Sequence, residues 1–252
     1  MAIVLSLFPG VGLLDLAFEL EGFCVVRGPD VLWGGDIRRF NPPAGKFDGI
    51  IGGPPCQAFS RLAHMVRHNG LQPKFGNLIP EFERCVREAQ PQWFLMENVP
   101  DAPVPKLVGD YWCMTFVLNN RQCLDENGEP AKQHRARRFT FGHRDEAKFR
   151  LEPAIVVFES LDTEYAACGG GSGGAETVTR KKRGLKGNLN DCVGANIKSA
   201  ASFRRICESQ GLPGDFDLEP FTVTAKCKAV GNGVPLPMGR TIARAVKEAI
   251  SG

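Results

Sequence analysis

Residues 47–51 form a short apolar run that leads directly into two glycines, two prolines and Cys56. The run predicts a buried strand, and the glycines and prolines stop that strand and fix a rigid loop. Open α/β sheets bind ligands at the edge where their strands end. A thiol at this position is placed as a nucleophile would be, although most free cysteines are simply small buried hydrophobes.

Composition is that of a soluble globular protein. Of the 252 residues, 43% are hydrophobic and 23% are charged, and this length accommodates one α/β domain with a small appendage. The apolar runs are too short to span a membrane, and the N-terminus lacks the basic start and cleavage site of a signal peptide. The net charge of +3 permits nucleic-acid binding without demonstrating it.

The nine cysteines are scattered along the chain, without a Cys-x-x-Cys pair and without the Cys/His spacing of a zinc site. We therefore expect no structural metal and no disulfide framework. Free thiols in this number are typical of a reducing cytoplasm.

Short apolar strands alternate with helices along the chain. The pattern predicts strands at 3–7, 23–26, 93–96 and 114–118, and helices at 13–20, between Asn77 and Pro91, and from about 236 to 250. Residues 8–12, Phe-Pro-Gly-Val-Gly, join the first strand to the first helix. Glycines at such a turn let a ligand approach the backbone, although many such turns are only tight connections.

Three acids stand at informative positions. Glu97 directly follows the apolar strand at 93–96, and a carboxylate there is costly unless it is paired or used. Asp36 lies in a Gly-Asp-Ile segment, where one possible role is to cap a short helix that begins at residue 37. Asp30 is the first acid after the strand at 23–26, which Arg27-Gly28-Pro29 follows directly. A carboxylate there could accept two hydrogen bonds from a diol such as a ribose; a plain loop acid is the alternative.

Arg135, Arg137 and Phe139 alternate within the segment Gln-His-Arg-Ala-Arg-Arg-Phe. This alternation predicts that their side chains lie on one face of a strand. A guanidinium fork donates to carbonyl and phosphate oxygens with fixed geometry. The alternative is a basic edge strand that guards against aggregation.

Two segments are polar and break any periodicity. Residues 61–75 suit a loop that closes over a nucleic acid, or a solvated surface loop. A glycine-rich run at 168–174 precedes a dense Lys/Arg cluster at 179–186, which suits wrapping of DNA but also describes a disordered loop.

Six segments, in this order along the chain, resemble motifs of the cytosine-C5 DNA methyltransferases. They are Phe-x-Gly-Val-Gly at 8–12, Gly-Asp-Ile at 35–37, Pro-Pro-Cys-Gln at 54–57, Glu-Asn-Val at 97–99 and Gln-x-Arg-x-Arg at 133–137, and Gly-Asn-Gly-Val-Pro at 231–235 matches the last family motif. The resemblance implies a Rossmann-like α/β sheet with helices on both faces. It implies a catalytic domain at 1–142 and 222–252, and a small irregular target-recognition region at 143–221.

The resemblance also implies roles for individual residues. The Cys56 thiolate would add to C6 of a cytosine flipped out of the duplex, Glu97 would hydrogen-bond to or protonate the ring, and Arg135 and Arg137 would hold the base and its phosphate. S-adenosyl-L-methionine would be the methyl donor. Its binding residues would be Phe8, Gly10, Val11, Gly12, Asp30, Asp36, Pro55, Asn232 and Val234.

The expected substrate is double-stranded DNA, and we expect a cytoplasmic monomer in a bacterial or phage-infected cell, acting in DNA methylation and restriction-modification. Two alternatives remain open. A tRNA cytosine-5 methyltransferase would also have a small recognition region. A catalytically silent nucleic-acid-binding relative would explain the missing ribose-binding acid and the short loop after residue 30.

Overall fold

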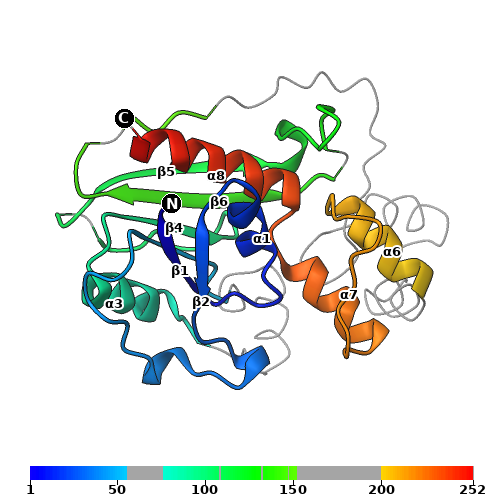
Figure 1. Ribbon diagram of the computed structural model, residues 1–252, viewed down its shortest axis with the longest axis horizontal. Helices are drawn as coiled ribbons and strands as arrows, with labels where there is room; N and C mark the ends of the chain where they lie inside the picture. The colour runs from blue at the N-terminus through cyan, green and yellow to red at the C-terminus, as the bar shows by residue number, and fades with distance from the viewer. Residues whose placement is uncertain (56–75, 108, 132, 147, 152–199, 252) are drawn as a thin grey trace. The chain divides into compact units, whose positions relative to one another are not determined.

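The computed structural model describes residues 1–55, 76–107, 109–131, 133–146, 148–151 and 200–251 (Figure 1). The chain divides into two compact units, the first comprising residues 1–118, 136–151 and 242–252, and the second residues 119–135 and 152–241. Cys56 with the loop at 61–75, and the basic cluster at 179–186, lie outside the described residues. The domain boundaries expected from the sequence remain a prediction.

A six-stranded sheet in the order β2-β1-β3-β4-β6-β5 organises the first unit. The first four of these strands run parallel, and β6 runs antiparallel to β4. The strands are β1 (Ile3–Leu7), β2 (Cys24–Arg27), β3 (Gly49–Gly52), β4 (Trp93–Asn98), β5 (Trp112–Asn119) and β6 (Ala136–His143). The expected Rossmann-like α/β class is confirmed, and each strand predicted from the sequence is present within a few residues.

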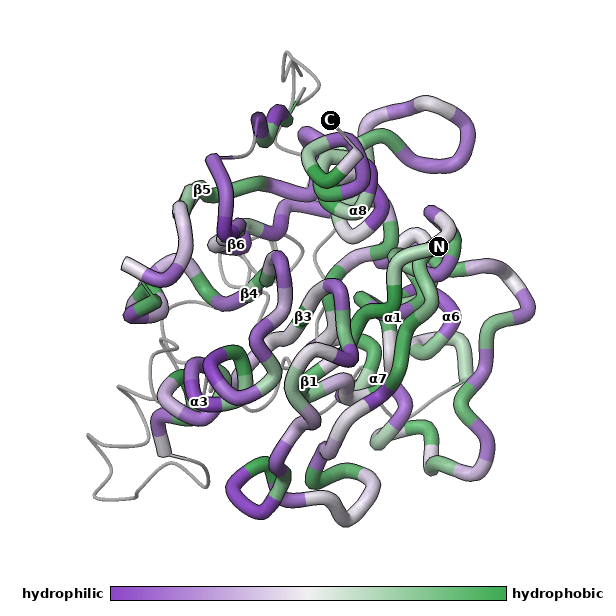
Figure 2. The backbone as a smooth tube through the Cα atoms, turned by 60° about the vertical axis from the view of Figure 1, so that its left-hand side comes forward, coloured by the Kyte–Doolittle hydropathy of each residue, from purple (hydrophilic) through white to green (hydrophobic). Residues whose placement is uncertain are grey.

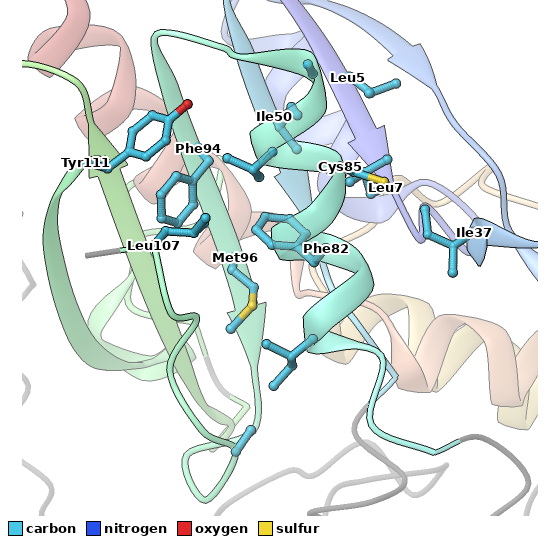
Figure 3. Close-up of a cluster of buried hydrophobic side chains, with 14 residues drawn as sticks. Leu5, Leu7, Ile37, Ile50, Phe82, Cys85, Phe94, Met96, Leu107 and Tyr111 are labelled. Carbon is cyan, nitrogen blue, oxygen red and sulfur yellow. The ribbon is translucent and has the colours of Figure 1, made fainter. Parts of the chain in front are cut away.

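Two helices cover opposite faces of this sheet. Successive side chains of a strand point to opposite faces, so in β4 Phe94 and Met96 share one face and Trp93 the other. Helix α3 (Ile79–Ala89) packs Phe82 against the Phe94 and Met96 face (Figure 3). Helix α1 (Leu13–Leu20) packs Phe18 against Trp93, with ring centroids 6.3 Å apart.

The sequence of α3 accounts for its start and its buried stripe. Asn77 accepts a hydrogen bond from the Ile79 amide at 3.0 Å, and proline occupies the first turn. Its buried residues recur at helical spacing, so hydrophilic and hydrophobic residues alternate along its turns (Figure 2). The buried residues are Ile79, Phe82, Glu83, Cys85, Val86 and Ala89.

The described residues of the second unit form mainly helices. A short 3-10 turn at Asn120–Gln122 has a reciprocal capping box with Asn119. Helices α6 (Ala200–Ser209) and α7 (Val223–Asn232) follow, and α8 (Leu236–Ser251) begins in this unit and ends in the first. Among the described residues, no helix is long and apolar enough to cross a bilayer, and no group of His, Cys, Asp and Glu could hold a metal ion.

A buried carboxyl ties α1 to the first two strands. Asp15, in the first turn of α1, is 0% exposed. Its carboxylate accepts from Ser6 Oγ at 2.5 Å and from Arg27 Nε at 3.0 Å. Burial raises the pKa of the Asp15 carboxyl, and the Ser6 hydrogen bond and the Arg27 charge lower it only in part.

Glycines make room for two aromatic side chains in the sheet. A methyl group on Gly49 would lie 2.1 Å from the indole ring of Trp93, and one on Gly142 would lie 2.1 Å from the ring of Phe94. Each glycine stands directly opposite its aromatic residue on the neighbouring strand. Since both rings are fully buried, neither can swing into solvent to relieve a clash.

Replacing Gly49 with alanine should therefore destabilise the protein. Overpacking of a closed core costs about 1–3 kcal/mol, and urea denaturation of Gly49→Ala should show that loss. Gly76→Ala is the matched control, because a methyl group there meets nothing within 4 Å, and its unfolding free energy should stay within about 0.5 kcal/mol of wild type. Equal stability of the two variants would contradict this account of the sheet.

Asp15 should make stability fall as pH rises. Its pKa in the folded chain lies above the ordinary value of 3.8, so the folded state binds the proton more tightly than the unfolded state. This contribution is full below pH 3.8 and is lost as pH rises through the raised pKa. Asp15→Asn lacks it, so the variant's unfolding free energy relative to wild type should increase across that range; a pH-independent difference would argue against the buried acid.

Candidate active site

Residues 53–55, which lead from the end of β3 to Cys56, are fixed by contacts with the end of β4. The chain leaves β3 at Gly52, and the buried side chain of Asn98 donates to the carbonyl of Pro54 at 3.1 Å. A methyl group on Gly53 would lie 3.0 Å from Oε2 of Glu97. The Glu97 carboxylate therefore lies beside the backbone that leads through Pro55 into Cys56. Cys56 itself falls outside the described residues.

Glu97 forms an ion pair with Arg137 across β4 and β6. The Arg137 Nε and Glu97 Oε1 atoms are 2.8 Å apart, and the two side chains are only 9% and 13% exposed. Arg137 also donates through Nη1 to the Ala136 carbonyl at 2.8 Å. A carboxylate this enclosed needs such a partner, since removing one member of a buried pair typically costs about 3–5 kcal/mol. The geometry leaves a fixed carboxylate and a fixed guanidinium at one edge of the sheet.

Arg135 has a different set of contacts. Strand β6 begins at Ala136, so Arg135 precedes it and belongs to the second unit. The expected shared strand face therefore holds for Arg137 and Phe139 and not for Arg135. Within the second unit Arg135 is 3% exposed and donates through Nη2 to the carbonyl of Gly233 at 3.0 Å.

That carbonyl lies in the segment of the last predicted motif. Asn232 is the final residue of α7, and Val234, two residues on, is 6% exposed. The hydrogen bond from Arg135 to Gly233 thus fixes the backbone between Asn232 and Val234. The cofactor roles of these two residues remain predictions.

The turn at residues 8–12 has an unusual backbone. Phe8, Gly10 and Gly12 all have positive φ angles, of 56°, 57° and 80°. This conformation costs little for glycine and is rare for a bulky residue such as phenylalanine. A methyl group on Gly10 would meet nothing within 4 Å, so open space adjoins the backbone there, as a bound ligand requires.

Asp30 and Trp33 hold the peptide groups of this turn. Asp30 accepts from the Gly10 amide at 2.9 Å with one oxygen and from the Leu32 amide at 2.7 Å with the other. The Trp33 indole donates to the Gly10 carbonyl at 2.7 Å, although its side chain is largely exposed. Asp30 therefore supports the glycine turn, and its predicted contact with a ribose stays a prediction. The sequence analysis did not predict the contact between Trp33 and the turn. The only sign of it in the sequence is the position of Trp33 close to the Gly-Asp-Ile segment.

Asp36 caps the short 3-10 turn at Ile37–Arg39. The backbone amide and Nε of Arg38 both donate to its Oδ1, at 3.1 and 2.9 Å. These hydrogen bonds hold the pKa of the Asp36 carboxyl below its usual value, so it is ionised at neutral pH. The capping alternative is thus present in the structure. Because both bonds use Oδ1, Oδ2 is available to accept a hydrogen bond from a ligand, which is what the predicted cofactor-binding role of Asp36 needs.

Comparisons with known proteins agree with these motifs. Residues 33–106 match the family model described as C-5 cytosine-specific DNA methylase. The type II methyltransferase M.FnuDI of Fusobacterium nucleatum is 37% identical over 112 residues, which cover 38% of this chain and 32% of that protein. M.HgiDI of Herpetosiphon aurantiacus is 32% identical over 204 residues, or 64% of this chain and 62% of that protein. The chain thus spans less than two thirds of the length of these relatives.

Solved structures share the fold. A prophage-encoded protein of E. coli, described as a DNA modification methyltransferase, superposes with a TM-score of 0.64 at 17% identity, covering all of both chains. DNMT2 of Spodoptera frugiperda superposes with a TM-score of 0.63 at 15% identity, over 99% of this chain and 100% of that one. The resemblance to the C-5 cytosine-specific DNA methylases that the motifs predict is thus confirmed over residues 33–106, and the solved structures confirm the fold.

Proposed function

We propose that this protein is a DNA (cytosine-5-)methyltransferase that uses Cys56 as its nucleophile and S-adenosyl-L-methionine as its methyl donor. One observation carries the proposal. Glu97 is paired with Arg137 at 2.8 Å and lies against Gly53, on the loop that leads into Cys56. A carboxylate, a guanidinium and the backbone preceding a cysteine thereby share one edge of an α/β sheet, where such folds carry out chemistry.

Cytosine C5 is a weak nucleophile, so the ring has to be activated. The Cys56 thiolate forms a bond to C6, and the ring electrons shift to give an enamine whose C5 is nucleophilic. Glu97 in its protonated form donates a proton to ring N3, which gains electron density as the thiolate adds, and takes that proton back when Cys56 leaves. Arg137 positions the Glu97 carboxyl group and donates to the base. After C5 gains the methyl group, a base removes the C5 proton, the C6–S bond breaks, and Cys56 leaves as the thiolate.

The residues of the glycine turn suit the cofactor. S-adenosyl-L-methionine, when bound, supplies an electrophilic methyl group on a sulfonium. The open space beside Gly10 accommodates its methionine portion, and Oδ2 of the ionised Asp36 accepts from the adenine amine. Phe8, Val11, Pro55, Asn232 and Val234 are the other residues that we propose for cofactor binding.

The family description and the names of the relatives favour DNA as the substrate. These relatives are named as type II methyltransferases, and a Bacillus phage SPR relative, 31% identical over 116 residues, is named an orphan methyltransferase. A target cytosine inside a duplex must be flipped out before Cys56 can reach C6. We place this activity in the bacterial or phage-infected cytoplasm, within DNA methylation and restriction-modification, with residues 143–221 reading the target.

Purified protein should transfer label from tritiated S-adenosyl-L-methionine to duplex DNA, and Cys56→Ala should abolish the transfer because the ring is no longer activated. Duplex DNA and tRNA are offered in one reaction and separated before counting. Label confined to tRNA would refute the DNA substrate, and equal labelling by Cys56→Ala would refute the covalent mechanism.

Glu97→Gln should lower kcat by about 10²–10⁴-fold, the usual contribution of a positioned acid or base, while leaving cofactor affinity near wild type. The control is Glu88→Gln, which alters a partly exposed carboxylate paired with Arg84 on α3 and should keep full activity. Single-turnover methylation gives the rate, and calorimetry gives the cofactor affinity. A Glu97→Gln rate within threefold of wild type would remove Glu97 from the mechanism.

A further inference from the structure

Arg27 occupies the end of β2, the place where nucleotide-binding α/β folds carry an acid for the ribose. We propose that Arg27 binds the carboxylate of the methionine portion of S-adenosyl-L-methionine, and so determines cofactor affinity through the amino-acid end of the ligand. The inference rests on the proposed function, because it concerns that cofactor.

One hydrogen bond to a buried acid fixes the orientation of the guanidinium. Its Nε donates to Asp15 at 3.0 Å, and Asp15 is itself held by the Ser6 hydroxyl at 2.5 Å in the core. The Arg27 side chain is nevertheless 54% exposed, whereas that of Asp15 is 1% exposed. The buried carboxylate therefore anchors one edge of the guanidinium and leaves its terminal nitrogens at the surface.

Those terminal nitrogens lie over the glycine turn. A methyl group on Gly12 would lie 2.7 Å from Nη2 and 3.0 Å from Cζ of Arg27. Any side chain at residue 12 would displace the guanidinium, so the glycine and the arginine fit each other. A ligand group that rests on this turn beside Gly12 therefore lies next to the Arg27 guanidinium.

Charge selects the ligand group. S-adenosyl-L-methionine carries a sulfonium, an ammonium and a single anion, the carboxylate. A guanidinium repels the first two and forms short, charge-assisted hydrogen bonds with the third. The ribose hydroxyls are neutral and gain less from a cation. Asp30, the acid expected to bind the ribose, has each oxygen hydrogen-bonded to a backbone amide. Asp30 therefore does not compensate for the acid that Arg27 replaces at the end of β2.

The test compares ligands that differ in the carboxylate alone. Calorimetry measures binding of S-adenosyl-L-methionine and of its decarboxylated analogue to wild type, Arg27→Gln and Arg27→Lys. In Arg27→Gln, affinity for the full cofactor should fall about tenfold or more, as expected for a charged hydrogen bond, with affinity for the decarboxylated analogue unchanged. Arg27→Lys, which keeps the charge, should recover part of the preference.

Arg244→Gln is the matched control. Arg244 pairs with Glu21 through Nε at 3.1 Å and is 53% exposed, so it resembles Arg27 in burial and bonding while lying at α8. Its substitution should leave both affinities unchanged. Circular dichroism checks the fold of each variant, and Arg27→Lys, which preserves a cation beside Asp15, carries the test if Arg27→Gln does not fold.

The remaining outcomes distinguish failure of this inference from failure of the proposed function. Equal weakening of both ligands in Arg27→Gln would overturn the inference, because the contact would then involve the nucleoside or the fold. Unchanged binding of both ligands would also overturn it. Failure of the wild type to bind S-adenosyl-L-methionine would refute the proposed function itself.

Discussion

The ion pair between Glu97 and Arg137 depends on the direction of one strand. Strands β1, β3 and β4 run parallel, so their carboxyl ends, and the turns that follow them, meet at a common edge. Strand β6 runs antiparallel to β4 and therefore begins at the edge where β4 ends. An arginine at the start of β6 meets a glutamate at the end of β4 for this reason. The antiparallel strand β6 thus brings the positive charge of Arg137 to the edge where β4 ends with Glu97.

Much of this architecture follows from local sequence. The apolar runs, the helical spacing of Phe82, Cys85 and Val86, and the stop at Pro91 each predict their element, since backbone preference and burial act over a few residues. Glu97 could also be singled out in advance, because an acid at the end of a buried strand needs a partner. Arg137, which pairs with Glu97, was also one of the site residues expected from the sequence, because its segment was expected to form a strand.

What local sequence could not supply is the pairing of distant groups. Arg135 and Arg137 look equivalent in the sequence, yet β6 begins between them, and one bonds to Gly233 while the other bonds to Glu97. Asp30 accepts a hydrogen bond from the Gly10 amide, a contact that the sequence did not indicate. Trp33 gave no sign that its indole would reach the Gly10 carbonyl. Each outcome depends on side-chain geometry between segments about twenty to a hundred residues apart, which periodicity does not encode.

The two glycines beneath buried aromatic rings have a consequence for how this core can change over evolutionary time. Gly49 faces Trp93 and Gly142 faces Phe94, on opposite faces of neighbouring strands. A larger residue at either glycine is tolerable only where its aromatic neighbour has already shrunk. Positions 49 and 93, and positions 94 and 142, should therefore co-vary among descendants of this chain, so that the centre of the sheet changes by compensated pairs while the edge that carries Glu97 and Arg137 stays in register.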